Sequence, residues 1–216
     1  VGTVLPWLAL SVENWKSQRK ELEQRADEEL GYPLFVKPSS MGSSVGISRC
    51  VSVSELRQGV LEALQYDDWI LVEKGIEARE IEVSLLGNLE AECSLPGEII
   101  PSDTFYSYEA KYLTGTSRLL IPAPLETARV GEIRRTALHA YRLLQLEGMA
   151  RMDFLLDRST GALWLNEPNT IPGFTEISMY PKLWEVSGLS YVDLLSRLVD
   201  LGVERWQRRR RLRTQR

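Results

Sequence analysis

Two carboxylates and one amide near the C-terminal end form the sharpest chemical pattern in the chain. Asp153 lies in the apolar run "RMDFLL", and Glu167 and Asn169 end the run "LWLNEPN". If the two runs pair as antiparallel strands, all three side chains can share one face, because strand side chains alternate. Their oxygens are hard ligands that suit Mg²⁺, which usually also takes substrate phosphates. The pattern predicts a magnesium site; the simpler alternative is that these acids are merely solvated.

A second pattern is the small-residue loop in "FVKPSSMGSSVG", which follows Lys37 at the end of an expected strand. Small residues let backbone N–H groups approach phosphate oxygens, and Lys supplies a positive point charge. No G-K-[ST] follows, so this is not a Walker loop. On this stretch alone, a phosphate loop and a plain hairpin turn are equally consistent.

A third pattern is the stretch "FYSYEAKYLTG", which contains three Tyr, with Lys111 and Tyr112 among its residues. We expect residues 97–115 to form a long irregular loop, and loops of this length are usually functional or disordered. A lid that closes on an anion and a packed surface loop both fit. The single His, His139, lies mid-helix and is interpreted as structural, which disfavours triad hydrolases.

The elements that must carry these residues are mixed α and β. We expect helices at 11–31, 52–67, 127–146 and 190–206, from capping residues and apolar spacing near 3.6. Strands are expected at 33–38, 45–52, 68–75, 80–88, 89–95, 117–124, 148–157 and 161–168. The strand at 68–75 is expected to be buried, and the one at 80–88 to alternate. Because hairpins dominate over β-α-β units, the order favours an α+β fold of two lobes.

Composition and charge narrow the class of protein. The chain has 216 residues, 44% hydrophobic and 26% charged, as expected for a globular protein with no membrane span. Two isolated cysteines, Cys50 and Cys93, fit a reducing compartment. Residues 205–216 hold seven Arg and no acid. Because the whole chain has a net charge of −4, residues 1–204 have a net charge of −11. We interpret this tail as a solvated helix end and expect no nucleic-acid or membrane partner.

Taken together, "VKPSSMGSSVGIS", "FYSYEAKY", "RMDF" and "NEPNTIPGFTEISMYPKL" resemble the D-alanine–D-alanine ligases of the ATP-grasp superfamily. The motifs occur in the family's order, and the resemblance covers the chain from about Gly31 to Val203. The resemblance implies an ATP-grasp fold of two α+β lobes with ATP bound between them. We expect lobes at 1–75 and 76–204 and a basic tail at 205–216. The family's N-terminal substrate-binding domain has no counterpart here, and the chain opens on Val1, so we expect part of a longer product.

The resemblance also implies roles for individual residues. Those implied to bind ATP are Lys37, Ser44, Glu73, Lys74, Glu80 and Lys111. Those implied to act in catalysis are Ser43, Tyr112, Arg151 and Gly173, with Arg151 and the Gly173 backbone binding the developing oxyanion. Two Mg²⁺, or Mn²⁺, would be held by Asp153, Glu167 and Asn169. The second amino acid would face Ser178, Tyr180 and Lys182. Pro168, between two metal ligands, departs from the family pattern, as does Met41 in the phosphate loop.

The implied activity is ATP-dependent joining of two D-alanine molecules through a D-alanyl phosphate, in the cytoplasm, for peptidoglycan synthesis, cell-wall biogenesis and cell shape. Two alternatives stay open. One is a relative that joins D-alanine to D-lactate or D-serine, although "YEAKY" and "SMYPKL" are similar to the dipeptide type. The other is a nucleotide-binding fragment without turnover. The family resemblance also allows a homodimer of the full-length protein.

Overall fold

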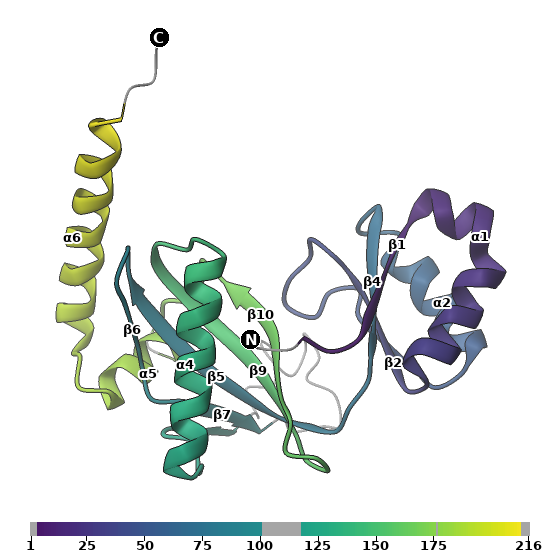
Figure 1. Ribbon diagram of the computed structural model, residues 1–216, viewed down its shortest axis with the longest axis horizontal. Helices are drawn as coiled ribbons and strands as arrows, with labels where there is room; N and C mark the ends of the chain where they lie inside the picture. Colours follow the sequence, from purple (N-terminus) through teal and green to yellow (C-terminus); the bar gives the residue numbers. More distant parts are fainter. Residues whose placement is uncertain (1–3, 101–117, 176, 213–216) are drawn as a thin grey trace. The chain divides into compact units, whose positions relative to one another are not determined.

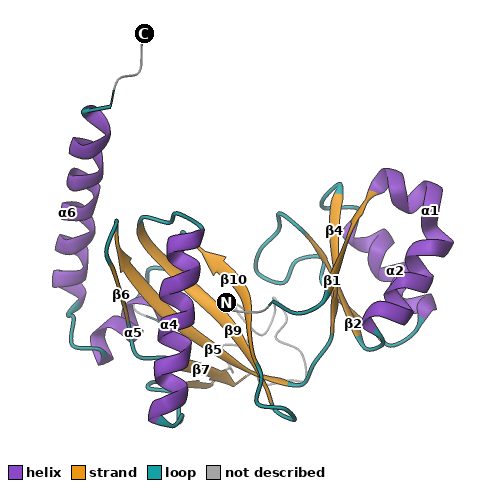
Figure 2. Ribbon diagram, in the orientation of Figure 1, coloured by secondary structure: helices purple, strands orange, loops and turns teal. Residues whose placement is uncertain are grey.

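The chain folds into two compact units. The computed structural model describes residues 4–100, 118–175 and 177–212. One unit comprises Val4–Glu77, and the other comprises Ala78–Ile100 with the described residues from Leu119 onward. Each unit contains its own sheet and helices, in agreement with the expected α+β class (Figure 2).

The N-terminal unit is a four-stranded antiparallel sheet with helices on one face (Figure 1). Its strand order is β1-β4-β2-β3. The strands are β1 (Trp7–Ser11), β2 (Leu34–Pro38), β3 (Ser48–Cys50) and β4 (Trp69–Lys74). The helices are α1 (Val12–Arg25), which continues into the π-helical turn η1 (Ala26–Leu30), and α2 (Val53–Ala63). Every element except β1 was predicted from the sequence.

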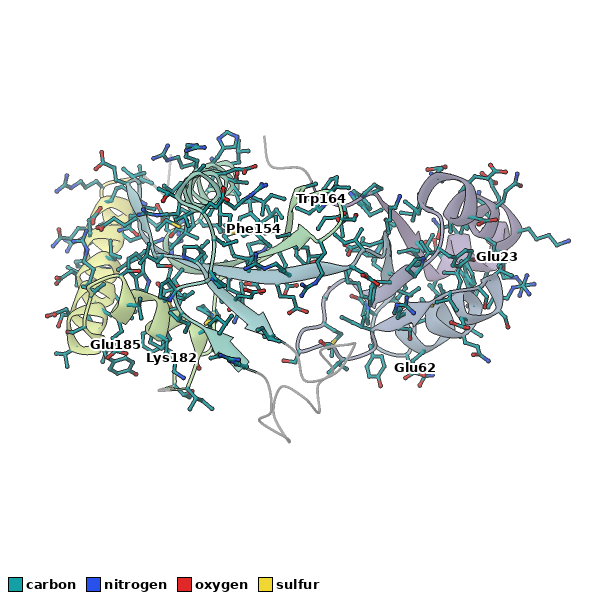
Figure 3. All side chains as sticks on the ribbon, turned by 90° about the horizontal axis from the view of Figure 1, so that it is seen from below. Glu23, Glu62, Phe154, Trp164, Lys182 and Glu185 are labelled. Carbon is teal, nitrogen blue, oxygen red and sulfur yellow. The ribbon has the colours of Figure 1, made fainter. Side chains whose placement is uncertain are left out.

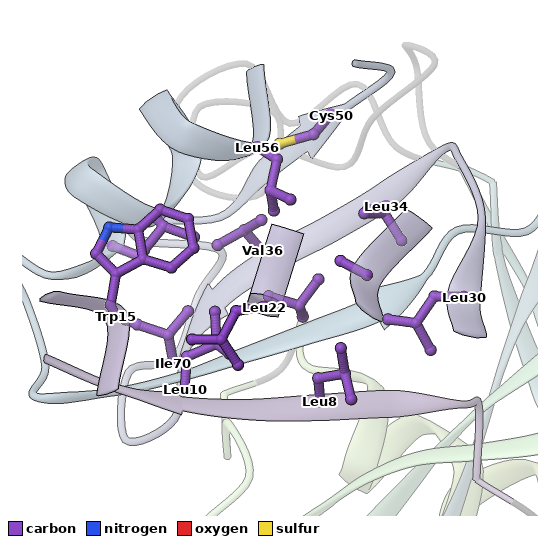
Figure 4. Close-up of a cluster of buried hydrophobic side chains, with 14 residues drawn as sticks. Leu8, Leu10, Trp15, Leu22, Leu30, Leu34, Val36, Cys50, Leu56 and Ile70 are labelled. Carbon is purple, nitrogen blue, oxygen red and sulfur yellow. The ribbon is translucent and has the colours of Figure 1, made fainter. Parts of the chain in front are cut away.

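Alternation along these strands separates a core face from a polar face. Leu8, Leu34, Val36 and Ile70 are buried together with α1 and α2 residues such as Trp15 (Figure 4). The expectation of a fully buried strand at 68–75 is wrong, because β4 is covered by helices on one face only. Its alternate residues are buried, whereas Trp69 at its start is 55% exposed.

Capping residues confirm three of the predicted helix ends in the N-terminal unit. The Asn14 backbone N–H donates to the Ser11 hydroxyl, and the Ser11 backbone N–H donates to the side-chain oxygen of Asn14. These two hydrogen bonds make a capping box. The helical stretch ends at Gly31, whose φ of 69° is a conformation that glycine adopts without steric cost. Ser52 caps α2 by accepting from the Glu55 backbone.

The C-terminal unit contains a six-stranded sheet with helices on both faces. Its order is β10-β9-β5-β7-β8, and β6 pairs with the far end of β5. The strands are β5 (Ala78–Gly87), β6 (Ala91–Cys93), β7 (Gly97–Ile100), β8 (Arg118–Leu120), β9 (Gly148–Asp157) and β10 (Leu163–Asn169). One face packs on α4 (Thr127–Leu143), with Phe154 on that side (Figure 3). The other packs on α5 (Met179–Val186) and α6 (Tyr191–Arg210).

Three sequence expectations differ from this unit. Residues 97–100, expected within a loop, form β7; the rest of the expected loop, 101–115, lies outside the described residues. The helix α5 was not predicted, because Pro181 lies inside it; Pro is tolerated there as the third helical residue. The expected half-buried alternation of β5 is replaced by burial of every residue from Ile81 to Gly87, because helices cover both faces.

The first part of the arginine-rich end is helical. The helix α6 continues to Arg210, and Arg205 and Arg208 both pair with Glu147. No helix among the described residues is long and apolar enough to cross a membrane. Both cysteines are free and buried, and burial raises the pKa of the Cys50 thiol to about 11.

Candidate functional site

A row of three carboxylates crosses the centre of the C-terminal sheet. Glu82 of β5 pairs in register with Asp153 of β9, and Asp153 pairs with Glu167 of β10. The next row places Arg151 opposite Asn169. Residues paired across neighbouring strands project from the same face. The pairing therefore brings the three predicted metal ligands and Arg151 together on one face, opposite to the face that packs on α4.

A β-bulge decides which face Glu167 occupies. Leu165 pairs with Phe154, but Glu167 already pairs with Asp153, so Asn166 is an extra residue with no opposite partner. Simple alternation from Leu165 would turn Glu167 toward the core face, since a one-residue shift reverses the side of every later residue. The bulge instead delivers Glu167 to the Asp153 face. Pro168 follows on this edge strand, where a missing N–H donor is tolerated.

The guanidinium of Arg151 is held by two carboxylates. Its Nε and Nη2 donate to the two carboxylate oxygens of Asp153, both at 2.7 Å. Its Nε also lies 3.1 Å from Oε2 of Glu82. Burial opposes the charged form of Arg151, but the Asp153 hydrogen bonds and the charges of Asp153, Glu82 and Glu167 outweigh it and raise the pKa of the guanidinium. Arg151 is therefore a fixed positive charge beside the candidate ligands.

The turn after β10 is closed by hydrogen bonds around Ser178. Thr175 donates its backbone N–H to Oγ of Ser178 at 3.0 Å, and the Ser178 N–H donates to the Thr175 carbonyl at 2.9 Å. A Cβ added at Gly173 would lie 2.9 Å from the Ser178 Oγ. The absence of a side chain at Gly173 thus lets the turn pack against Ser178, the residue at the N-cap position of α5.

The start of α5 is anchored in the core. Tyr180 is fully buried and donates its hydroxyl to the Leu85 carbonyl at 2.8 Å. Ser84 donates to the carbonyl of Tyr180 at 3.2 Å. Lys182 lies on the less buried side of α5, near Glu185 (Figure 3). Tyr180 is therefore placed to hold α5 on the sheet, whereas Ser178 and Lys182 are more accessible.

In the N-terminal unit, two predicted ATP-binding residues form an ion pair. Lys37 and Glu73 lie on neighbouring strands, and the Nζ–Oε2 distance is 2.6 Å. Both are on the face of the sheet opposite to α1 and α2. Lys74 pairs in register with the core residue Leu34, so its exposed side chain projects from the face that packs on the helices. Glu73 and Lys74 therefore do not present their side chains to the same side.

The loop after Lys37 has an unusual backbone. Ser43 and Ser44 have φ values of 56° and 61°, and Gly46 has 72°. Positive φ is uncommon for residues other than glycine and is often kept at ligand sites. A Cβ at Gly46 would lie 2.8 Å from both Pro38 and Tyr66. The loop is thus a tightly defined turn, of the kind whose backbone N–H groups can cradle an anion.

The candidate ligands suit a hard divalent cation. Among the described residues, no group of three or more His, Cys, Asp or Glu side chains gathers as a metal cluster. The candidate ligands on β9 and β10 are not such a group, because they are two carboxylates, Asp153 and Glu167, and the amide of Asn169. Carboxylate and amide oxygens beside a fixed Arg fit Mg²⁺ with phosphate ligands, rather than a thiolate or imidazole metal.

Comparison with known families decides the class. The family model described as D-ala D-ala ligase C-terminus matches residues 3–200. The chain belongs to the D-alanine–D-alanine ligase family. A D-alanine–D-alanine ligase of Heliobacterium modesticaldum is 50% identical over 98% of this chain and 58% of its own length. One from Thermoanaerobacter sp. strain X514 is 54% identical over 89% of this chain and 53% of its own length.

Solved structures of the D-alanine–D-alanine ligase family have the same fold. The enzyme from Coxiella burnetii matches 96% of this chain and 55% of its own, with 36% identity and a TM-score of 0.81. The VanG D-Ala:D-Ser ligase from Enterococcus faecalis matches 92% of this chain and 57% of its own, with 33% identity and a TM-score of 0.81. The expected ATP-grasp fold is confirmed. The chain spans about half the length of the curated relatives that it matches.

The sequence-predicted residues of this ligase family fall into separate groups. Arg151, Asp153, Glu167 and Asn169 share a sheet face. Lys37 and Glu73 pair within the N-terminal unit, while Glu80 lies two residues before Glu82 on β5. Lys111 and Tyr112 lie outside the described residues. Glu82 was missed, although the alternation in "EIEV" places it on the face of Glu80.

Proposed function

We propose that this chain is the nucleotide- and metal-binding part of an ATP-dependent ligase that joins two D-alanine molecules for peptidoglycan synthesis. Family membership supports the reaction class. The observation that carries the proposal is the register that sets Glu167 against Asp153 and Asn169 against Arg151 on one face. The protein would act in the cytoplasm and contribute to cell-wall biogenesis and cell shape; its two free, buried cysteines suit a reducing compartment.

The chemistry begins with a carboxylate, which is a poor electrophile. Transfer of the γ-phosphoryl group of ATP to the first D-alanine converts it to an acyl phosphate, and this transfer depends mainly on positioning and charge neutralisation. In the N-terminal unit, Lys37 and the Ser43–Ser44 loop would bind phosphates. Glu73 would bind the adenine, and Lys74 would do so through its backbone, because its side chain lies on the opposite face of the sheet. Glu80 would bind the ribose and Lys111 the γ-phosphate. Asp153, Glu167 and Asn169 would hold two Mg²⁺, or Mn²⁺, which supply charge neutralisation.

The amine of the second D-alanine then attacks the carbonyl carbon of the acyl phosphate. The tetrahedral oxyanion that forms needs fixed donors, and it collapses to the dipeptide by expelling inorganic phosphate as the C–O bond breaks. Arg151, which is hydrogen-bonded to Asp153 and ion-paired with Glu82, is suited to this role, together with the Gly173 N–H. Ser178 and Lys182 would contact the second amino acid. Tyr112 would close over the substrates with Ser43. Tyr180, whose hydroxyl is buried, would act by fixing α5. We propose no nucleic-acid or membrane partner, and a homodimer for the full-length protein.

A second candidate is a ligase that joins D-alanine to D-serine or D-lactate, because a D-Ala:D-Ser ligase is among the similar structures. The third is a nucleotide-binding fragment without turnover. The test is ATP-dependent phosphate release with D-alanine, D-serine or D-lactate, run on this chain and on a version with an upstream region. Release with D-alanine alone supports the first candidate, and preference for D-serine or D-lactate supports the second. Nucleotide binding without release in either version supports the third.

A further inference from the structure

We propose that Glu82 is a positioning residue that holds Arg151 in place independently of Asp153. The proposal deepens the proposed function, because it concerns the residue assigned there to the oxyanion. Glu82 is 5% exposed and lies 3.1 Å from Nε of Arg151. No role in metal or nucleotide binding is assigned to it.

Arg151 needs a second carboxylate partner because Asp153 is also a proposed Mg²⁺ ligand. Both of its oxygens accept from Arg151 at 2.7 Å, yet the same oxygens are the ones proposed to bind Mg²⁺. A carboxylate that also binds a cation accepts weaker hydrogen bonds from Arg151. Glu82 lies on the other side of Asp153 from Glu167 in the same row, so it can remain with Arg151.

Charge points to the same assignment. The row of Glu82, Asp153 and Glu167 carries three negative charges against the single positive charge of Arg151. Two carboxylates are enough for the metal, and Glu167 is the more exposed partner. A third carboxylate that is almost fully buried costs desolvation free energy unless it has a charged partner. Arg151 is the charged partner of Glu82 among the described ion pairs.

The same sheet offers a matched control. Glu98 is also 5% exposed and accepts two hydrogen bonds from Arg79, at 2.8 and 2.7 Å. It is paired in register with Ile81, so it lies on the α4 side, away from Arg151. Neutralising Glu98 disturbs a buried ion pair of the same kind without touching the Arg151 face. A purely structural role for Glu82 predicts equal effects of Glu82→Gln and Glu98→Gln.

The first test needs no metal or nucleotide. Asp153→Asn removes the other counter-charge, and exchange of the Arg151 Nε–H with water is followed by ¹⁵N NMR, assigned with Arg151→Lys. We expect the signal to persist in Asp153→Asn and in Asp153→Asn with Glu98→Gln. In Asp153→Asn with Glu82→Gln, exchange should be at least about tenfold faster, because a charge-assisted contact is lost. Equal exchange in the two double variants would overturn the proposal.

The second test uses single variants in the longer, active ligase and covers the case in which a double variant does not fold. Glu82→Gln should lower kcat about 10- to 100-fold with KM for ATP changed less than about twofold, because Arg151 acts in the transition state. Glu98→Gln should leave kcat within about twofold. Normal kcat in Glu82→Gln contradicts the proposal. If the wild-type protein does not ligate D-alanine, the proposed function fails, and the NMR result still decides whether Glu82 holds Arg151.

Discussion

Removing the hydroxyl of Tyr180 tests whether this residue anchors α5 on the sheet or contacts the substrate. The sequence motif assigns Tyr180 to the second amino acid, but its side chain is fully buried and donates to the Leu85 carbonyl at 2.8 Å. Tyr180→Phe removes the donor and leaves this buried carbonyl with one partner fewer. Such a loss costs about 1–2 kcal/mol of unfolding free energy. For a protein of this size, that corresponds to a decrease in Tm of about 2–8 °C.

Tyr141 provides the matched control. It is 1% exposed and donates its hydroxyl to the Gly87 carbonyl at 2.7 Å, from α4 on the other face of the sheet. Tyr141→Phe should therefore cost about as much stability as Tyr180→Phe, near 1–2 kcal/mol. No role in substrate binding is assigned to Tyr141, so it calibrates the purely structural effect of losing such a hydroxyl.

The assay combines urea unfolding of both variants with steady-state kinetics in the longer ligase. We expect both variants to lose similar stability and to keep KM for D-alanine within about threefold of the parent, because neither hydroxyl contacts substrate. Unchanged stability in Tyr180→Phe together with a more than tenfold rise in KM for D-alanine would refute the anchoring role. It would restore the assignment made from the motif.

The remaining predictions concern the metal ligands, the β9–β10 turn and the phosphate loop. Glu167→Gln should abolish Mg²⁺-dependent phosphoryl transfer in the longer ligase yet leave Tm equal or higher, because facing carboxylates repel each other; near-normal turnover would exclude Glu167 as a ligand. The Ser159 hydroxyl and backbone N–H groups of the turn lower the pKa of Asp157 to about 2. The ionised Asp157 therefore adds to the free energy of unfolding above its ordinary pKa of 3.8, and this stabilisation is lost as the pH falls through about 2. Asp157→Asn should remove that part of the acid-induced loss in urea titrations between pH 5 and 2, and an unchanged pH profile would contradict it. Gly46→Ala should destabilise the N-terminal unit by about 1–3 kcal/mol, because φ is 72° and the new Cβ meets Pro38 and Tyr66; chemical denaturation of the variant measures this, and full stability would show that the loop adapts.

Local chemistry in the sequence was enough to predict most elements. Helix ends depend on local contacts and backbone conformation, so Ser11 and Gly31 could be identified by residue type, and the start of α2 could be narrowed to Ser52 or Ser54. The strand pair β9–β10 follows from two apolar runs joined by a short turn. Elements whose identity depends on distant partners were missed or mistaken. Among these, β1 is stabilised by pairing with β4, and the helix α5 by its packing on the sheet.

The candidate site shows the same division. Residue types and two adjacent apolar runs suggest Asp153, Glu167 and Asn169 as candidate ligands, because carboxylate and amide oxygens are hard ligands. The sequence could not reveal that Asn166 forms a bulge, because a bulge exists only relative to the partner strand. It could not separate the buried Tyr180 from the accessible Ser178. Nor could it bring Glu82 to Arg151, since the two residues are 69 positions apart in the sequence and only the pairing of β5 with β9 makes them neighbours.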